Sequence, residues 1–179
     1  MEENAAVAYV YCNYKERDQT PINLVASLLQ QLIQSQPAIP RDIVSICKDH
    51  IHKKTRPSLA EYSRLLQSQV QRFSEVYIII DALDECTEVY GINNFLPEIR
   101  KLLPNIHLLV TSRFVSNIER EFAEASRLEI RANETDIRDY IEARIAAQPQ
   151  MMRHIEADPT LRNALLDTII QKADGMYVT

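Results

Sequence analysis

The run VYIII at residues 76–80 is the feature that most limits how this 179-residue chain can fold. It is β-branched or aromatic throughout, and it leads directly into the acidic string DALDE, which begins at Asp81 and ends at Glu85. A continuous apolar run of this kind is typical of a strand in the middle of a sheet, where both faces are covered. The sequence therefore predicts a buried central strand with carboxylates at its end.

Strand-like and helical patterns alternate along the rest of the chain. Residues 5–11 form a second uncharged strand pattern, which we also expect to be buried on both faces, and residues 106–110 and 126–130 form two more. Apolar residues recur at helical spacing between them, and Thr20 with Pro21 and Ser58 with Glu61 are helix-start signals. This order predicts the α/β fold class, with a three-layer parallel sheet that has helices on both faces.

Composition excludes several classes of protein. With 46% hydrophobic and 25% charged residues, the chain is globular, and we expect a single domain over residues 1–179. Gly91 and Gly175 are its two glycines, so the sequence contains no glycine-rich phosphate-binding loop. The net charge of −5 argues against a positive electrostatic field around the whole protein, which would attract nucleic acids. We therefore expect no nucleic-acid partner.

The apolar runs also bear on where the protein acts. The longest uninterrupted run covers residues 5–12, far short of the roughly 20 residues of a membrane-spanning helix. The first residues are acidic, whereas a signal peptide begins with basic ones. We expect no membrane partner and a cytoplasmic location, in which the three cysteines, Cys12, Cys47 and Cys86, are reduced thiols.

The acidic string is the first candidate site, because ligands of parallel sheets bind beyond the carboxyl ends of the strands. Asp81 ends the central strand, and Asp84 and Glu85 follow within one turn, which predicts three carboxylates close together. Neighbouring carboxylates repel one another, and Mg²⁺ relieves this repulsion. Mg²⁺ takes oxygen ligands and usually binds together with substrate phosphates. The string therefore indicates a nucleotide site, and the alternative is a solvated acidic loop.

The second candidate segment is Thr111, Ser112 and Arg113, which directly follows the strand at residues 106–110. If this strand neighbours the central one, the Arg113 guanidinium can approach a phosphate held near the acidic string. Arginine suits this role because its planar donor fork stays charged and matches phosphate oxygens. The alternative is a surface arginine paired with a carboxylate.

These strings, taken together, resemble a known family. VYIIIDALDEC and IHLLVTSR, in this order and spacing, are similar to the Walker B and sensor-1 segments of NACHT-type signal-transduction ATPases of the STAND class, above all the fungal and nephrocystin-like members. AVAYVYCNYKERDQTPINLVASLLQQL resembles the strand and helix that follow the phosphate-binding helix there, and KADGMYV resembles the close of the domain. The resemblance implies a P-loop NTPase-like fold and, in intact relatives, ATP or GTP with Mg²⁺ as the bound group.

The resemblance also implies roles for individual residues. Asp81 corresponds to the aspartate that coordinates Mg²⁺, and Glu85 or Asp84 corresponds to the catalytic acid that positions or activates the attacking water. Arg113 corresponds to the sensor arginine near the γ-phosphate. Thr111 and Ser112 complete the cofactor-binding segment. Fungal relatives often join such a domain to an effector domain and to ankyrin or WD repeats.

The chain departs from the family pattern at its beginning. NACHT domains start with a strand and a G-x-x-x-x-G-K-[ST] loop, whose backbone N–H groups and lysine hold the phosphates. This sequence begins where the strand after that block would begin. We therefore expect a partial NTPase domain, truncated at its N-terminus and ending at the domain's C-terminal edge, that hydrolyses little or no ATP or GTP by itself.

The missing block has a consequence for the sheet. The resemblance implies the strand order 5-1-4-3-2, in which the absent first strand lies between the strands at residues 106–110 and 126–130. Two unpaired inner edges cost free energy and invite association. The chain should re-pair its strands, associate with itself or with full-length relatives, or be marginally stable.

Two other interpretations follow. The first is a non-catalytic interaction module that uses an exposed sheet edge or its helical faces. The second, an unrelated serine or cysteine hydrolase, ranks last because the sequence has no G-x-S-x-G motif and Cys86 has no histidine partner in the pattern.

Overall fold

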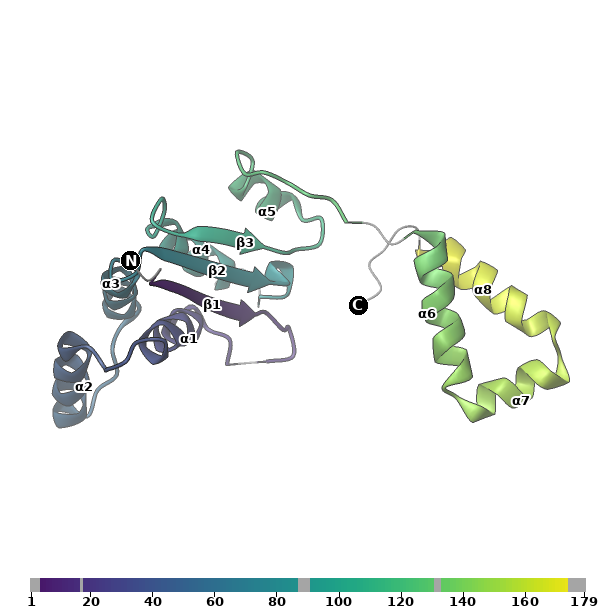
Figure 1. Ribbon diagram of the computed structural model, residues 1–179, viewed down its shortest axis with the longest axis horizontal. Helices are drawn as coiled ribbons and strands as arrows, with labels where there is room; N and C mark the ends of the chain where they lie inside the picture. The colour runs from purple at the N-terminus through teal and green to yellow at the C-terminus, as the bar shows by residue number, and fades with distance from the viewer. Residues whose placement is uncertain (1–3, 17, 87–90, 131–132, 174–179) are drawn as a thin grey trace. The chain divides into compact units, whose positions relative to one another are not determined.

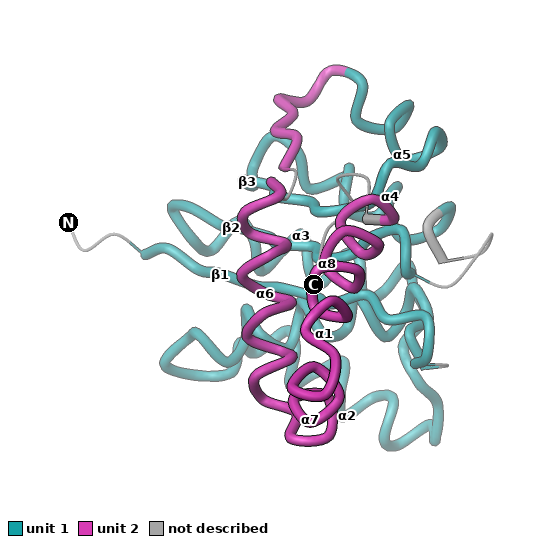
Figure 2. The backbone as a smooth tube through the Cα atoms, turned by 90° about the vertical axis from the view of Figure 1, so that its right-hand side faces the viewer, with its two compact units in different colours: residues 1–123 teal, residues 124–179 magenta. Residues whose placement is uncertain are grey.

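The computed structural model describes residues 4–16, 18–86, 91–130 and 133–173. The chain forms two compact units, residues 1–123 and residues 124–179, which Figure 2 shows in different colours. We expected one domain over residues 1–179. The chain divides because each unit buries its apolar side chains in a hydrophobic core of its own.

A parallel sheet forms the centre of unit 1. In the described part of the chain its strands are β1 (Ala5–Tyr11), β2 (Glu75–Asp81) and β3 (His107–Val110), in the order β1-β2-β3 (Figure 1). The VYIII run lies in β2, and β2 is central as predicted. The register pairs Tyr11 with Asp81 and Ile80 with Val110, so all three strands have their carboxyl ends at the same end of the sheet.

Helices of unit 1 share one core with the sheet. They are α1 (Pro21–Gln34), α2 (Arg41–Lys53), α3 (Leu59–Val70), α4 (Gly91–Arg100) and α5 (Ser116–Glu121), with the short 3-10 helix η1 (Leu83–Glu85). The predicted starts of α1 and α3 are confirmed. The Thr20 side chain accepts a hydrogen bond from the Asn23 N–H, and Ser58 and Glu61 form a capping box.

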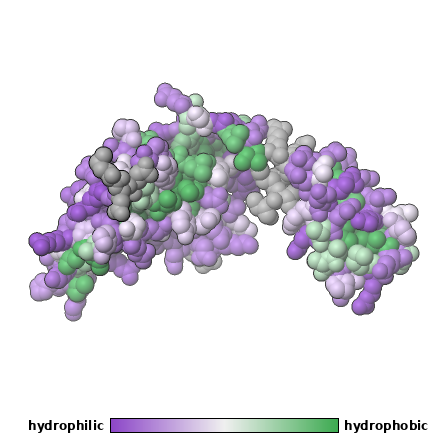
Figure 3. Space-filling model, viewed as in Figure 1, coloured by the Kyte–Doolittle hydropathy of each residue, from purple (hydrophilic) through white to green (hydrophobic). Residues whose placement is uncertain are grey.

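One face of the sheet carries these helices, where we expected helices on both. Burial alternates along β1, and the side chains of its outer face are exposed, with Tyr9 at 50% and Tyr11 at 64%. Leu109 of β3 is 58% exposed on the same face. Figure 3 shows a band of hydrophobic side chains over the strands. The prediction of strands buried on both faces was wrong, because no described segment of unit 1 covers this face.

The predicted strand at residues 126–130 was also wrong. This segment has irregular backbone, and Leu128 and Ile130 are 84% and 63% exposed. A strand needs a neighbour to take up its hydrogen bonds. Among the described residues, the sheet ends at β3 and offers residues 126–130 no paired strand.

Unit 2 is helical. Its elements are α6 (Glu134–Ala146), α7 (Pro149–Ala157) and α8 (Thr160–Ala173), and its core is formed by Ile137, Ile141, Ile145 and Leu166. Gly175 and most of the string KADGMYV lie outside the described residues. Of the helices that the structure describes, none is both long enough and apolar enough to cross a membrane.

Candidate functional site

The candidate site lies at the carboxyl ends of β2 and β3. Asp81 is the last residue of β2, and the next residue, Ala82, has a left-handed backbone with φ 52°. This conformation is unfavourable for a residue with a Cβ atom, so the surrounding contacts must hold it. It turns the chain into η1, where the side chain of Leu83 is fully buried and anchors the loop.

Thr111 holds the start of this loop through both its backbone and its side chain. Its N–H donates to the Ile80 carbonyl at 2.9 Å, and its own carbonyl accepts from the Leu83 N–H at 2.9 Å. The Thr111 hydroxyl accepts from the Ala82 N–H at 2.9 Å and donates to Asp81 Oδ1. These bonds fix Asp81 and the strained Ala82 against β3.

Arg113 binds Asp84 through two hydrogen bonds. The Arg113 backbone N–H donates to Asp84 Oδ1 at 2.9 Å, and its Nε–H donates to Asp84 Oδ2. The Asp84 side chain is 5% exposed, whereas that of Arg113 is 66% exposed. Burial opposes ionisation of Asp84, but the hydrogen bonds from the Arg113 backbone and side chain, together with its charge, hold the pKa of Asp84 below its usual value. The hydrogen bond between the two side chains also raises the pKa of Arg113.

Glu85 differs from Asp84 in its access to solvent. Its Oε1 atom lies 3.9 Å from Arg113 Nη2, and its side chain is 29% exposed. Ser112 lies between Thr111 and Arg113, just after β3, and its hydroxyl donates to the Arg113 carbonyl at 2.8 Å. The structure thus brings together the two predicted segments, residues 81–85 and residues 111–113. Arg113 lies beside the acidic string, as the first interpretation requires, and it is also paired with a carboxylate, as the alternative requires.

The three carboxylates do not crowd together as expected. Asp81 is bound by Thr111, whereas Asp84 and Glu85 lie beside Arg113. Within residues 4–16, 18–86, 91–130 and 133–173, no group of three or more histidine, cysteine or acidic side chains could hold a metal ion. Mg²⁺ that is ligated mainly by water and phosphates needs one or two carboxylates, and Asp81 can supply one.

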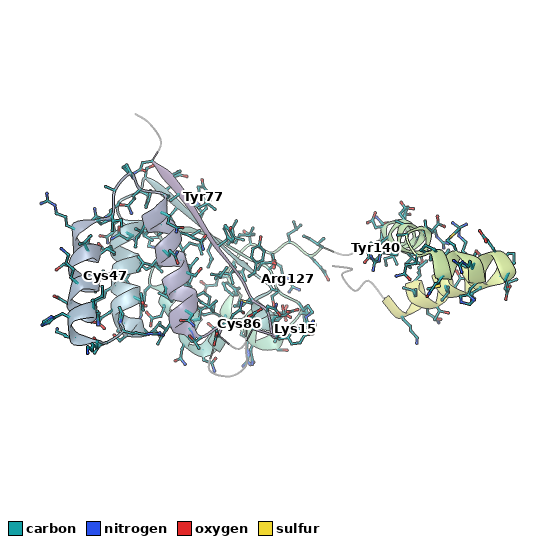
Figure 4. The ribbon with its side chains drawn as sticks, turned by 90° about the horizontal axis from the view of Figure 1, so that it is seen from below. Lys15, Cys47, Tyr77, Cys86, Arg127 and Tyr140 are labelled. Atoms are coloured by element: carbon teal, nitrogen blue, oxygen red, sulfur yellow. The ribbon has the colours of Figure 1, made fainter. Side chains whose placement is uncertain are left out.

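Residues that follow β1 also belong to this end of the sheet, and our sequence reasoning did not assign them to the site. The Cys12 N–H donates to the Asp81 carbonyl at 2.9 Å. Figure 4 shows Lys15 at the same end of unit 1 as Cys86, and the Lys15 ammonium lies 5.5 Å from the centre of the Tyr14 ring. The position of these residues just after a predicted strand was the signal that could have found them.

Cys12 and Cys86 form a contact beneath the site. Both side chains are buried. Hydrogen bonding from Cys12 lowers the pKa of the Cys86 thiol, against the effect of burial. The same interaction with Cys86, together with burial, raises the pKa of Cys12.

Unit 2 contains an apolar groove of about 280 Å³ between its helices. Ile141, Met151 and Leu165 are among the residues that line it, and no carboxylate does. This lining offers no carboxylate ligand for a metal ion such as Mg²⁺, so the strand ends of unit 1 remain the candidate site.

Comparisons with known proteins agree with this fold. The family described as Nephrocystin 3, N-terminal, matches residues 1–113. No curated protein matches the chain. Among solved structures, the chain is similar to the Orc1 protein of Aeropyrum pernix, solved in complex with DNA, with a TM-score of 0.50 and 17% identity. The similarity covers 80% of this chain and 35% of the Orc1 chain. At this identity the likeness shows the fold alone, and it confirms the P-loop NTPase-like α/β class.

Proposed function

The chain belongs to the nephrocystin-3 N-terminal family, and from this membership we propose that the carboxyl ends of β2 and β3 form the acidic and arginine side of a nucleotide site in a NACHT-type signalling switch. The observation that carries the proposal is the pair of neighbouring contacts Thr111 to Asp81 and Arg113 to Asp84. In a longer protein, such a domain would act together with effector and ankyrin or WD repeat domains.

The contacts suggest a different role for each acid. Asp81 would be the ligand of Mg²⁺, which supplies positive charge to the phosphates of ATP or GTP when it is bound. Glu85 is the acid with access to water and would orient a water molecule. Asp84 is buried against Arg113, so we assign it to positioning the guanidinium rather than to the chemistry. Thr111 and Ser112 then fix the segment that carries Arg113.

The same residues predict weak binding by this chain alone. Carboxylates repel phosphates unless a cation lies between them, and the sequence contains no glycine-rich loop with a lysine to grip the phosphates. Arg113 is the one basic side chain in the predicted site, and Asp84 already neutralises part of its charge. We expect a dissociation constant for ATP or GTP of about 1 mM or weaker, and little or no hydrolysis.

Equilibrium binding and phosphate release test this proposal. Labelled ATP and GTP are titrated onto the purified chain with Mg²⁺ and with EDTA, and released phosphate is followed over hours. Weak binding that requires Mg²⁺ and disappears in Asp81→Asn supports the proposal, with Asp49→Asn, an exposed acid of α2, as the matched control. Saturation at micromolar nucleotide would contradict the inactivity, and binding that is indifferent to Mg²⁺ would contradict the role of Asp81.

A second candidate function is an interaction module, and the two edges of the sheet favour it. Side-chain amides close the outer edge of β1. Gln31 accepts from the Tyr9 N–H at 3.0 Å and donates to the Tyr9 carbonyl at 2.8 Å. Gln19 donates to the Tyr11 carbonyl at 2.6 Å and accepts from the Asn13 N–H at 2.7 Å. The outer edge of β3 has no neighbouring strand among the described residues.

We propose that the occupant of the β3 edge is a second copy of this chain. Two identical strand edges can pair antiparallel about a two-fold axis, which would join the two sheets into one and place the two exposed apolar faces side by side. Sedimentation at several concentrations tests this, with Leu109→Lys expected to weaken the dimer. Ile51→Lys, on α2, removes an apolar residue that is similarly exposed and is the control. A monomer at all concentrations would contradict the second candidate.

A further inference from the structure

Three polar side chains, Thr55, His50 and Glu61, form a cluster where the chain passes from α2 to α3. The His50 Nδ1 atom lies 2.7 Å from the Thr55 hydroxyl oxygen, and the His50 Nε2 atom lies 3.4 Å from Glu61 Oε1. Figure 4 shows Cys47, three residues before His50, on the helical side of unit 1 and away from Cys86. The cluster is therefore separate from the candidate nucleotide site.

The end of α2 brings Thr55 to His50. Lys54 has a left-handed backbone with φ 53°, and its N–H donates to the Ile51 carbonyl at 3.2 Å. The N–H of the next residue, Thr55, donates to the His50 carbonyl at 3.0 Å. These two bonds make a Schellman motif, in which the side chains of the first and last residues commonly form an apolar contact. Here a hydrogen bond between Thr55 and His50 takes the place of that contact.

Glu61 orients the imidazole ring of His50. The capping box at the start of α3 fixes the Glu61 carboxylate, because its Oε2 atom accepts from the Ser58 N–H and hydroxyl. An ionised carboxylate only accepts hydrogen bonds, so the ring nitrogen that faces it carries the proton. Nε2–H then donates to Glu61, and Nδ1 accepts from the Thr55 hydroxyl. The His50 side chain is 17% exposed, whereas Thr55 is open to solvent.

We propose that Thr55 is a nucleophile that accepts acyl groups from small activated carboxylic esters, with His50 as its general base and Glu61 as the residue that positions His50. A hydroxyl that binds a base, which a third group orients, is the arrangement that activates a nucleophile. Lys54 and Arg56 flank Thr55 in the chain, and their charge favours the negative charge that develops on the acyl oxygen. This inference does not depend on the proposed nucleotide site.

The reaction transfers the acyl group first to Thr55 and then to water. The Thr55 hydroxyl oxygen bonds to the carbonyl carbon of the ester, and its proton passes to His50 Nδ1. The bond between that carbon and the leaving oxygen breaks, and the alcohol departs with the proton from His50. Water then attacks the acyl group, with its proton passing through His50 to the Thr55 oxygen. One ester and one water molecule give one carboxylic acid and one alcohol.

A fluorophosphonate tests the nucleophile, because it labels hydroxyl groups that a neighbouring base activates. The folded chain is incubated with the fluorophosphonate, from which the hydroxyl oxygen displaces fluoride, and is analysed as intact protein and after digestion. We expect one adduct, on Thr55. The adduct should be absent in Thr55→Ala and unchanged in Thr20→Ala, the matched control at another exposed threonine. Release of p-nitrophenol from p-nitrophenyl acetate measures the acyl transfer in the same proteins.

Two further variants test the partners of Thr55. His50→Gln keeps a side chain that forms hydrogen bonds and should be labelled about 100-fold more slowly. Glu61→Gln keeps the capping box and the thermal midpoint but should also slow labelling, whereas Asp49→Asn, at an exposed acid of α2, should not. No adduct on Thr55, an equal rate in His50→Gln, or an equal rate in urea would overturn the nucleophile. An adduct without faster release of p-nitrophenol than in Thr55→Ala would overturn the acyl transfer.

Discussion

Arg113 and Asp84 show how one pair of side chains shapes the candidate site. An almost fully buried carboxylate is held by a residue whose own side chain is 66% exposed, so the pair depends on Arg113 remaining in place. Removing one partner of such a pair leaves an uncompensated charge in the core. The Arg113 backbone N–H, which a substitution by alanine retains, limits this loss.

We predict that Arg113→Ala lowers the free energy of unfolding, because it leaves the buried Asp84 carboxylate without its charged partner. The control is Arg72→Ala, which removes an arginine whose side chain and partner, Asp42, are both substantially exposed and which should cost at most about 1 kcal/mol. Urea unfolding of the three proteins gives the comparison. Equal losses in the two variants would show that Asp84 does not need the guanidinium.

The pKa of Asp84 gives a pH dependence with a definite sign. Because the folded-state pKa is lower than the ordinary value of 3.8, the unfolded chain binds more protons between these two values. This contribution to stability is therefore complete above pH 3.8 and is lost as pH falls through the folded-state pKa. We predict that stability decreases less steeply below pH 4 in Asp84→Asn than in the unmodified chain, as measured by urea unfolding in a pH series.

Helix starts are the elements that the sequence predicts best, because they depend on residues three positions apart. In α3, the Glu61 carboxylate accepts from the Ser58 N–H at 2.8 Å and from its hydroxyl at 2.7 Å, and these bonds lower the pKa of Glu61 to about 2. We predict that Ser58→Ala costs about 1 kcal/mol and raises the pKa of Glu61. Ser45→Ala, at an exposed position within α2, is the control that should cost nothing.

An NMR titration of the Glu61 side chain, together with urea unfolding, measures both effects. The variant keeps the backbone N–H of residue 58, so if the pKa of Glu61 stayed near 2 in Ser58→Ala, the Ser58 hydroxyl would not contribute to the shift.

Features that depend on distant segments were the ones that the sequence could not predict. The pattern at residues 126–130 alternates as a strand should, yet it forms none, because strand formation requires a neighbour. Likewise the apolar run in β1 does not reveal that Tyr9 and Tyr11 lie on an uncovered face. The meeting of Asp81, Asp84 and Arg113 was predictable, since it follows from adjacent parallel strands. Which acid Arg113 binds depends on the left-handed turn at Ala82, which no local pattern indicated.

At the scale of the whole molecule, the chain is two units with separate cores. The segment that joins them includes residues 126–130, which have irregular backbone and strongly exposed apolar side chains. Proteases cut such segments first, because the backbone must become extended to enter a protease site. We predict that brief trypsin treatment cleaves after Arg127 before it cleaves after Arg64 in α3 or Arg100 in α4, as intact-mass analysis would show. First cuts inside α3 or α4 would contradict the division into units.

The central claim, that the ends of β2 and β3 are one side of a nucleotide site, is tested most directly by mapping where nucleotide contacts the chain. The ¹⁵N-labelled protein is titrated with Mg²⁺ and ATP or GTP while the backbone amides of Ala82, Thr111 and Arg113 are followed by NMR. We predict Mg²⁺-dependent chemical-shift changes of these amides at about millimolar nucleotide, whereas the amides of α2 should stay unchanged. Shifts confined to other parts of the chain, or none at about 10 mM nucleotide, would contradict it.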